Sequence, residues 1–287
     1  MAMNELKHKR VKTNGVELHL VEAGDPEGEL IIFLHGFPEF WYGWRKQIEY
    51  FAKAGFHVVA PDQRGYNLSD KPKRIRDYRL DVVTEDIVGL IDAFGRQKAV
   101  IVGHDWGGIT AWWTAVKYPD RIEKLCVLNA PHPTVFGKEI RHNPKQRRKS
   151  WYFFFFQIPW FPERRMRKNN WDVGRRALQS TSRKGTFADN DIAQYREAWS
   201  QPGSATGMIN WYRAMRYAPK IDKKPRVAVP TLLLWGMKDR FISFSTAEKS
   251  IALCDNGKLE RVESGSHWVQ HEESELVNAS LHAFLKV

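Results

Sequence analysis

The sequence has no hydrophobic run long enough to cross a membrane, and it has only two cysteines. A membrane-spanning helix needs roughly 20 apolar residues, whereas the longest aromatic run, residues 151–160, is shorter and contains proline. Residues 1–15 are polar and hold no apolar stretch of signal-peptide type. Cys126 lies in an apolar run and Cys254 is far from it in sequence. We therefore expect a cytoplasmic protein without disulfide bonds.

Motifs for binding phosphate, zinc or nucleic acid are also missing. There is no Walker loop, no zinc-finger spacing and no RNA-binding aromatic signature. The net charge is nevertheless +12, and residues 135–217 alone hold 17 Lys or Arg against 6 Asp or Glu. Charge by itself is weak grounds for a partner, so we expect no nucleic-acid partner. A solvated basic surface and weak association with anionic membranes both remain open.

Short apolar runs alternate with helical patterns in the first half of the chain and again near its end. A continuous apolar run such as residues 30–34 is typical of a buried strand in a parallel sheet, and residues 81–95 have the apolar period of a helix. This alternation predicts an α/β fold. The expected strands are residues 16–23, 30–34, 57–61, 99–102, 125–130, 231–236 and 258–263, and the expected helices include residues 81–95, 109–120 and 273–286.

The alternation stops between about residues 134 and 218. This stretch is basic, aromatic and helix-like, and it contains no strand-like run. The simplest interpretation is an inserted helical unit over an α/β core. The sequence therefore predicts a discontinuous core, residues 1–133 and 219–287, and a helical cap, residues 134–218.

Residues 103–107, Gly-His-Asp-Trp-Gly, fit the Gly-x-nucleophile-x-Gly turn between a strand and a helix. Glycine permits the tight turn, which raises the central side chain above the carboxyl edge of the sheet. Here that side chain is Asp105, a carboxylate that needs no deprotonation at neutral pH. A carboxylate can attack an electrophilic carbon and form an ester. Asp105 is therefore the predicted nucleophile, and His104 is a neighbour in the turn rather than a metal ligand.

Two partners follow in the order that this fold requires, which is nucleophile, acid and histidine. Asp239 follows the strand-like run ending at residue 236, and His267 follows the last strand-like run. Loops at strand ends are where such sheets assemble their sites. His271 is an alternative histidine that we expect to face outward, and Asn129 is an alternative position for the acid.

At this point the chain resembles a known family, the α/β-hydrolase-fold epoxide hydrolases of the soluble and microbial branch. The resemblance covers nearly the whole chain, and the set of motifs is specific although no single one is. The matching motifs are HGFP (35–38), DQRGYNLSDKP (62–72), GHDWGG (103–108), NAPHP (129–133), WYFFFFQIP (151–159), NWYRAM (210–215), WGMKDRF (235–241) and SGSHWVQHE (264–272).

The resemblance implies that two cap tyrosines, Tyr152 and Tyr212, hold the epoxide oxygen. Opening the ring leaves an alkoxide, which departs poorly unless a donor protonates or hydrogen-bonds it. The resemblance also implies an oxyanion hole made by the backbone N–H groups of Phe37 and Trp106, and a cis bond between Phe37 and Pro38.

The implied reaction is hydrolysis of a lipophilic epoxide to a vicinal diol. Asp105 forms an ester, and His267, oriented by Asp239, activates the water that hydrolyses it. We expect no metal or organic cofactor, since the histidines lack a metal spacing. A monomer and a homodimer are both compatible with the sequence. The predicted substrate site is apolar and draws on His35, Pro38, Trp41, Trp44, residues 153–156 (Phe155 in particular), Trp211 and Trp268.

Two alternatives stay open. A haloalkane-type dehalogenase would use the same aspartate, but it would hold halide with N–H donors such as the Trp106 indole. Phe37 stands where haloalkane dehalogenases commonly carry Asn, and Trp106 stands where fluoroacetate dehalogenases carry Arg. A non-catalytic binding protein on this fold would be expected to have a broken triad, whereas all three triad residues are present.

Overall fold

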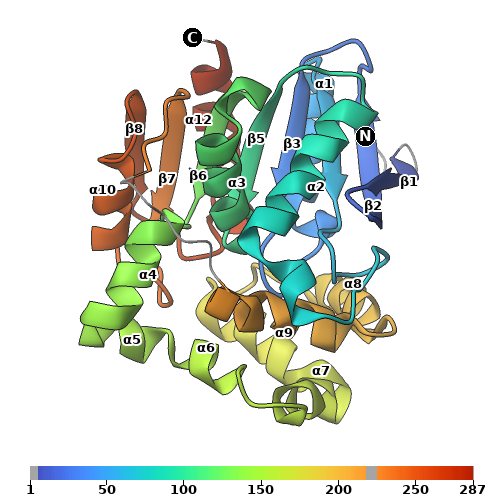
Figure 1. The fold of residues 1–287 in the computed structure, drawn as a ribbon, viewed down its shortest axis with the longest axis vertical. Helices are drawn as coiled ribbons and strands as arrows, with labels where there is room; N and C mark the ends of the chain where they lie inside the picture. Colours follow the sequence, from blue (N-terminus) through green and yellow to red (C-terminus); the bar gives the residue numbers. More distant parts are fainter. Residues whose placement is uncertain (1–5, 218–224, 287) are drawn as a thin grey trace.

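The computed structural model describes residues 6–217 and 225–286. Its centre is a single eight-stranded sheet in the order β1-β2-β4-β3-β5-β6-β7-β8 (Figure 1). The strands are β1 (Lys7–Thr13), β2 (Val16–Gly24), β3 (Leu30–Leu34), β4 (His57–Pro61), β5 (Ala99–His104), β6 (Ile122–Leu128), β7 (Thr231–Gly236) and β8 (Gly257–Val262).

The sheet is mostly parallel. β2 pairs antiparallel with β1 and with β4, and the remaining neighbours from β4 to β8 all pair in parallel. Every residue of β3, β4, β5 and β7 is buried, as expected for strands covered on both faces. The predicted α/β fold is confirmed.

Helices cover both faces of the sheet and form a core against each. One face packs on α1 (Arg45–Lys53) and α12 (Ser274–Lys286), and the other on α2 (Leu80–Ala93), α3 (Trp106–Lys117) and α10 (Ser245–Ile251). A short helix, α11 (Val269–Glu272), leads into α12. The alternating inward side chains of each central strand fill the two cores.

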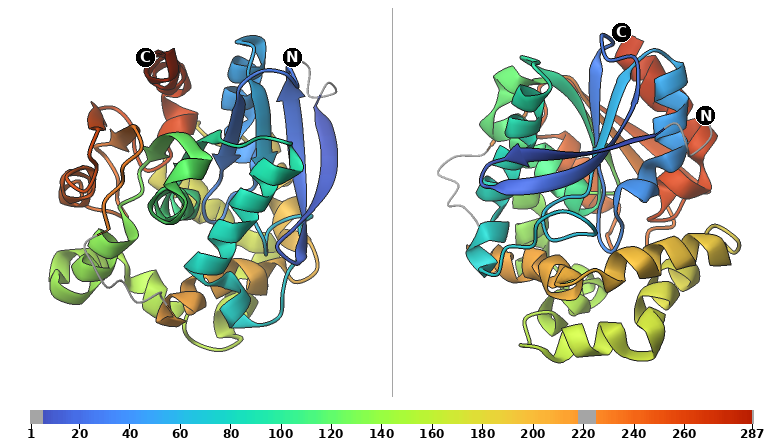
Figure 2. Two further views of the ribbon diagram at one scale, coloured as in Figure 1. Left: turned by 45° about the horizontal axis from the view of Figure 1, so that its top comes forward. Right: turned by 90° about the vertical axis from the view of Figure 1, so that its right-hand side faces the viewer.

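The described residues between β6 and β7 form helices and no strand, and these helices lie together across the carboxyl end of the parallel strands (Figures 1 and 2). We call them the helical layer. Its members are α4 (Pro133–His142), α5 (Pro144–Lys149), α6 (Trp151–Phe155), α7 (Phe161–Thr181), α8 (Asp189–Ser200) and α9 (Ser204–Ala214). The boundary that we predicted between residues 218 and 219 lies outside the described residues.

Local capping explains why the helical layer consists of short pieces. The Asn143 side chain accepts the N–H groups of Lys145 and Gln146, and Pro144 occupies the first turn, so α5 starts anew after α4. Within α7, residues 168–171 leave helical backbone angles and produce a kink. The basic first half of α7 therefore points differently from its second half.

Three of the hydrogen bonds that fasten the helical layer to the core come from buried aromatic side chains of the layer. The Tyr195 hydroxyl donates to Glu39 Oε1 at 2.7 Å. The indole N–H of Trp199 donates to the Pro38 carbonyl at 2.6 Å, and the indole N–H of Trp211 donates to the Arg64 carbonyl at 2.9 Å. Because the donors in these bonds are buried, separating the two parts would leave them unsatisfied.

The structure differs from the sequence predictions at the amino-terminal edge. Strand β1 was not predicted, because its sequence KHKRVKT is charged and mostly exposed rather than alternating. Both cysteines are buried and unpaired, as expected. Among the described residues, no helix is long and apolar enough to span a membrane.

Candidate active site

Asp105 stands at the turn between β5 and α3 and has a φ of +50°. This turn depends on glycines because the backbone approaches itself closely. A Cβ atom at Gly103 would overlap the carbonyl of Gly107, and one at Gly107 would overlap the carbonyl of Leu34. The strained φ is held by this packing and displays the carboxylate at the carboxyl edge of the sheet.

The Asp105 carboxylate has one donor on each oxygen. Phe37 donates its backbone N–H to Oδ1 at 2.8 Å, and His267 Nε2 lies 3.6 Å from Oδ2. Burial alone raises the pKa of the Asp105 carboxyl, but the hydrogen bond and positive charge of His267 outweigh burial and lower it. Asp105 is therefore ionised at neutral pH.

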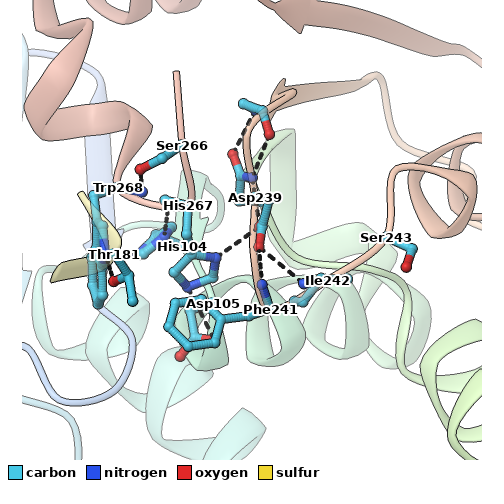
Figure 3. A network of polar contacts seen from close by, with 12 residues as sticks. His104, Asp105, Thr181, Asp239, Phe241, Ile242, Ser243, Ser266, His267 and Trp268 are labelled. Atoms are coloured by element: carbon cyan, nitrogen blue, oxygen red, sulfur yellow. Dashed lines mark hydrogen bonds and ion pairs between the residues drawn. The ribbon is translucent and has the colours of Figure 1, made fainter. Parts of the chain in front are cut away.

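Asp239 holds His267 from the other side, as Figure 3 shows. His267 Nδ1 lies 2.8 Å from Asp239 Oδ2, and Oδ1 accepts the backbone N–H groups of Phe241 at 2.7 Å and Ile242 at 2.9 Å. Burial raises the pKa of the Asp239 carboxyl, but these partners lower it overall. The three residues predicted as a triad thus form a row of contacting side chains, in which His267 lies between Asp105 and Asp239.

The protonation of His267 depends on both carboxylates. Burial lowers the pKa of its imidazole, and the charges and hydrogen bonds of Asp239 and Asp105 raise it to about 10. Two carboxylates around one imidazole therefore favour the imidazolium at neutral pH.

Asn129, the alternative acid position, lies beside Asp239 rather than replacing it. Its side-chain N–H donates to Asp239 Oδ2 at 2.8 Å, and its Oδ1 accepts the N–H of Gly236 at 2.8 Å. Asn129 is therefore a hydrogen-bonding support for the acid.

The prediction that His271 faces outward is wrong. His271 is 4% exposed, and its Nε2 lies 2.6 Å from Glu39 Oε1. Burial raises the pKa of Glu39, but His271 and His104 lower it well below its usual range. His104 in turn lies 2.8 Å from the backbone carbonyl of His267. The helical period of the sequence could not reveal that the buried carboxylate of Glu39 lies opposite His271.

Tyr152 on α6 and Tyr212 on α9 face the same space, with ring centroids 5.9 Å apart. Tyr212 also packs edge-on against Phe37, at 5.1 Å, and Trp106, at 5.0 Å. Burial, reinforced by the charge of Asp105, raises the pKa of both phenols well above its usual value. Both tyrosines are therefore neutral hydrogen-bond donors at neutral pH.

Two largely apolar cavities, each about 190 Å³, meet at Asp105 and Tyr152. Cavity A runs towards α4, and the residues that matter for it here are Trp106, Ile140, Arg141, Phe153 and Trp211. Cavity B runs beneath α6 and α7, and the residues that matter for it here are Pro38, Trp151, Phe155, Arg165, Tyr212, Phe241, His267 and Trp268.

The predicted substrate-site residues that line a cavity are Pro38, Phe153, Phe155, Phe156, Trp211 and Trp268. Those that line neither cavity are His35, Trp41, Trp44 and the exposed Phe154. The imidazole of His35 accepts the backbone N–H of Gln63 at 3.0 Å and so braces the loop below the site. Trp41 packs on the amino-terminal strand through His8, with ring centroids 5.5 Å apart.

Phe241 was missed at the sequence level. It lines cavity B and packs edge-on against His267, with ring centroids 5.0 Å apart. Its position two residues after Asp239 was the available signal, since the loop that carries the acid must pass the histidine.

A metal centre was not expected here. Within residues 6–217 and 225–286, no group of three or more His, Cys, Asp or Glu side chains is arranged to hold a metal ion. The site offers instead a carboxylate, a histidine, and two phenols facing apolar space. This arrangement suits attack on carbon followed by hydrolysis of an ester.

Comparison with known proteins gives matches over the whole chain. Residues 29–274 match the alpha/beta hydrolase fold family. The chain is 45% identical over 284 residues to the AB hydrolase superfamily protein YfhM of Bacillus subtilis, covering 99% of both chains. It is 41% identical to human Epoxide hydrolase 4, covering 96% of this chain and 78% of the relative. A crystal structure of Bacillus megaterium epoxide hydrolase with an inhibitor superposes with a TM-score of 0.90, at 33% identity, covering 97% of this chain and 100% of the other.

Proposed function

The chain belongs to the α/β-hydrolase-fold family and is an epoxide hydrolase within it, and we propose that it works through an ester on Asp105. The observation that carries this proposal is the position of the Asp105 carboxylate. It lies between His267 and the Phe37 N–H, at the meeting point of two apolar cavities and beside two buried phenols.

In the first step, one carboxylate oxygen of Asp105 attacks a carbon of the epoxide ring. A new C–O bond forms and the bond between that carbon and the ring oxygen breaks, which leaves an alkoxide on the neighbouring carbon. Tyr152 and Tyr212 support this oxygen from the helical layer, and one of them transfers its proton to it. Their raised pKa values keep both phenols neutral, so the donors are available before the alkoxide forms.

In the second step, His267 Nε2 takes a proton from water, and the hydroxide attacks the carbonyl carbon of the ester. The Phe37 N–H, which contacts Asp105 Oδ1 at 2.8 Å, stabilises the resulting oxyanion together with the N–H of Trp106. The tetrahedral intermediate then releases the diol and restores the Asp105 carboxylate. One water is consumed: its oxygen stays in the restored carboxylate, one of its protons stays on His267, and the other passes to the departing oxygen of the diol.

Formation of the ester also changes His267 from an acid into a base. Asp105 and Asp239 together raise the pKa of His267 to about 10 in the free protein. Esterification removes the charge of Asp105, so the pKa of His267 falls. Its proton then passes to the tyrosinate that ring opening leaves. The neutral imidazole that the second step needs is thus produced by the first step.

The cavities support a lipophilic substrate with a substituent on each side of the ring. Both are lined mainly by aromatic and aliphatic side chains, and they diverge from Asp105. We propose that the helical layer serves as the cap, with α6 and α9 supplying the two phenols and the aromatic walls of this space.

A single-turnover reaction in H₂¹⁸O tests the ester mechanism. Excess protein is mixed with styrene oxide, and the peptide containing Asp105 is analysed by mass spectrometry. We expect ¹⁸O in the Asp105 carboxylate and not in the first diol released, since water attacks the ester carbonyl. Label found only in the diol would mean that water attacks the epoxide directly, and Asp105→Asn serves as the unlabelled control.

Bromide release from a bromoalkane tests the dehalogenase alternative. The indole of Trp106 packs against the rings of Phe153, Trp211 and Tyr212. It lines cavity A together with Tyr152. We therefore expect diol from styrene oxide without bromide from the bromoalkane. Bromide without diol would assign the leaving-group contact to the Trp106 indole instead.

A further inference from the structure

The segment from Trp151 to Phe161 exposes an unusual number of large apolar side chains. Within the described residues, eight such side chains are exposed, and five of them lie in this segment. Trp160 is 70% exposed and Trp151 is 62% exposed. We call these five residues the aromatic face, and they are Trp151, Phe154, Ile158, Trp160 and Phe161. Scattered single apolar residues need no explanation, but a contiguous group of this kind marks a binding surface.

Positive charge lies beside the Trp160–Phe161 end of the aromatic face. A surface groove that begins at Trp160 and Phe161 is lined by the basic side chains Arg164, Arg165, Arg167 and Lys168. The one carboxylate in this groove, Glu163, is buried and already paired with Arg213 at 2.6 Å. Within the described parts of the chain, none of the four groove cations forms an ion pair with an acidic side chain. Their charge is therefore available to an external anion.

The charge of the whole molecule is concentrated on the same side. Of the net charge of +12, the helical-layer residues 135–217 contribute 17 basic and 6 acidic side chains, so the rest of the chain is nearly balanced. Such a one-sided distribution orients the molecule at a negatively charged surface, with the helical layer facing it.

The aromatic face is continuous with cavity B. Trp151 belongs to both, and Arg165 lines both the cavity and the groove. Phe155 packs against Trp151 and against Phe161, with ring centroids 5.9 Å apart in each case, and it also lines cavity B. Apolar side chains therefore lead from the exposed surface to Asp105 without a break.

We propose that the aromatic face and its four groove cations dock on anionic lipid bilayers and place the mouth of cavity B against the membrane. Tryptophan is enriched at membrane interfaces, and basic residues beside it bind anionic headgroups. A lipid surface explains the exposed Ile158 better than nucleic acid does, because phosphates gain nothing from aliphatic carbon and isoleucine has no ring on which a base could stack. Docking itself is independent of the reaction proposed above.

Flotation with vesicles tests the docking. Purified protein is mixed with phosphatidylcholine vesicles, with or without 30% phosphatidylglycerol, at 50 mM and 500 mM NaCl. We expect binding to the anionic vesicles at 50 mM NaCl, weaker binding at 500 mM because salt screens the charges, and little binding to phosphatidylcholine alone. Arg164→Gln with Arg167→Gln should weaken the binding about 25-fold, from roughly fivefold for each cation. Phe154→Ser with Trp160→Ser should abolish the vesicle binding that remains at 500 mM NaCl.

Matched variants elsewhere control for nonspecific effects. Lys98→Gln with Lys258→Gln removes the same charge from exposed side chains of the core, and Leu276→Ser removes an exposed apolar side chain from α12. Neither should change vesicle binding by more than about twofold. All seven substituted side chains are exposed, so circular dichroism should show each variant folded.

Four results would overturn the proposal. The first is no binding to anionic vesicles at 50 mM NaCl, and the second is equal loss in the test and control variants. The third is retention of duplex or single-stranded DNA at 50 mM NaCl without vesicle binding, which would assign the surface to nucleic acid. A dimer that dissociates on Phe154→Ser with Trp160→Ser, in a protein that ignores vesicles, would assign it to a second copy. Diol formation from water-soluble styrene oxide should be unchanged in every variant, so a failure of docking is distinguishable from a failure of the proposed reaction.

Discussion

Replacing Asp239 by asparagine separates the two chemical steps. Asp239 Oδ2 accepts from His267 Nδ1 and from the side-chain N–H of Asn129, each at 2.8 Å. Its Oδ1 accepts the backbone N–H groups of Phe241 and Ile242 at 2.7 and 2.9 Å. An asparagine presents an NH₂ group to one of these two pairs, so two donors lose their acceptor whichever way the amide is turned.

The magnitude follows from what each step needs. Hydrolysis of the ester needs a neutral, oriented His267, and loss of the orienting carboxylate in a serine-protease triad lowers kcat by on the order of 10⁴. We expect hydrolysis to slow by roughly 10³- to 10⁴-fold. Ring opening uses Asp105 and the tyrosines, so it should slow by less than about tenfold. Two buried unsatisfied donors should lower the free energy of unfolding by about 2–6 kcal/mol.

Rapid quenching followed by intact-protein mass spectrometry measures both steps. Asp239→Asn, mixed with styrene oxide, should accumulate the ester on Asp105 within the first turnover and release diol slowly. The reasoning is refuted if no ester accumulates while diol formation slows, or if ring opening slows as much as hydrolysis does.

The double variant Asp239→Asn with Asn129→Asp is the matched control. It keeps one carboxylate and one amide in contact, and Asn129 has a positive φ of 43° that aspartate tolerates. If negative charge near His267 is the main requirement, hydrolysis should recover at least about tenfold relative to Asp239→Asn. No recovery would show that the position of the acceptor matters more than its charge.

Three further outcomes are expected. Tyr152→Phe and Tyr212→Phe should each slow ring opening by about 10- to 10²-fold, and more when combined, because each removes a donor to the alkoxide; burst kinetics measure this. Gly36→Ala would place a methyl carbon within 2.6 Å of Asp105 Oδ1 and should lower kcat/KM by at least about 10²-fold in a protein that circular dichroism shows folded. The pKa of His267 is raised from 6.5 to about 10 by folding, so the stability it contributes is full below pH 6.5 and is lost as the pH rises towards 10. Urea titrations should show a decline of up to about 1.4 kcal/mol per pH unit in this window, which His267→Gln removes.

Each of these expectations has a contrary result. Unchanged burst rates in the double tyrosine variant would remove the phenols from ring opening. Full activity of Gly36→Ala would mean that the Asp105 carboxylate has more room than its surroundings indicate. An unfolding free energy that does not change between pH 6.5 and 10 would mean that His267 is neutral in the folded protein.

The central strands and the site residues could be predicted because their local sequence carries the constraint. Residues 30–34, 57–61 and 231–236 are continuous apolar runs, and the structure gives strands with these same bounds. The glycines around Asp105 are required by the turn itself. The structure accordingly brings Asp105, His267 and Asp239 together.

What could not be predicted depends on contacts between distant segments. Strand β1 is charged and lies at the sheet edge, where pairing with β2 rather than burial of its own side chains defines it. His271 is buried because Glu39, more than 200 residues away in sequence, lies opposite it. Trp41 follows the HGFP motif by three residues, and Trp268 directly follows His267. Both tryptophans are buried, yet only Trp268 lines a cavity. Composition cannot decide which of two aromatic residues lines an opening.

The attachment of the helical layer to the core has a consequence for how substrate enters and product leaves the site. Tyr195, Trp199 and Trp211 each donate a hydrogen bond from the layer to the core, and breaking all three costs about 3–9 kcal/mol before any apolar contact is lost. We therefore expect the helical layer to stay in place on the core during turnover rather than to open by a hinge motion. Substrate and diol must pass through side passages, where the exposed Arg141 and Trp151 stand at the openings. We therefore expect rotation of these side chains, rather than movement of whole helices, to admit the substrate and release the diol.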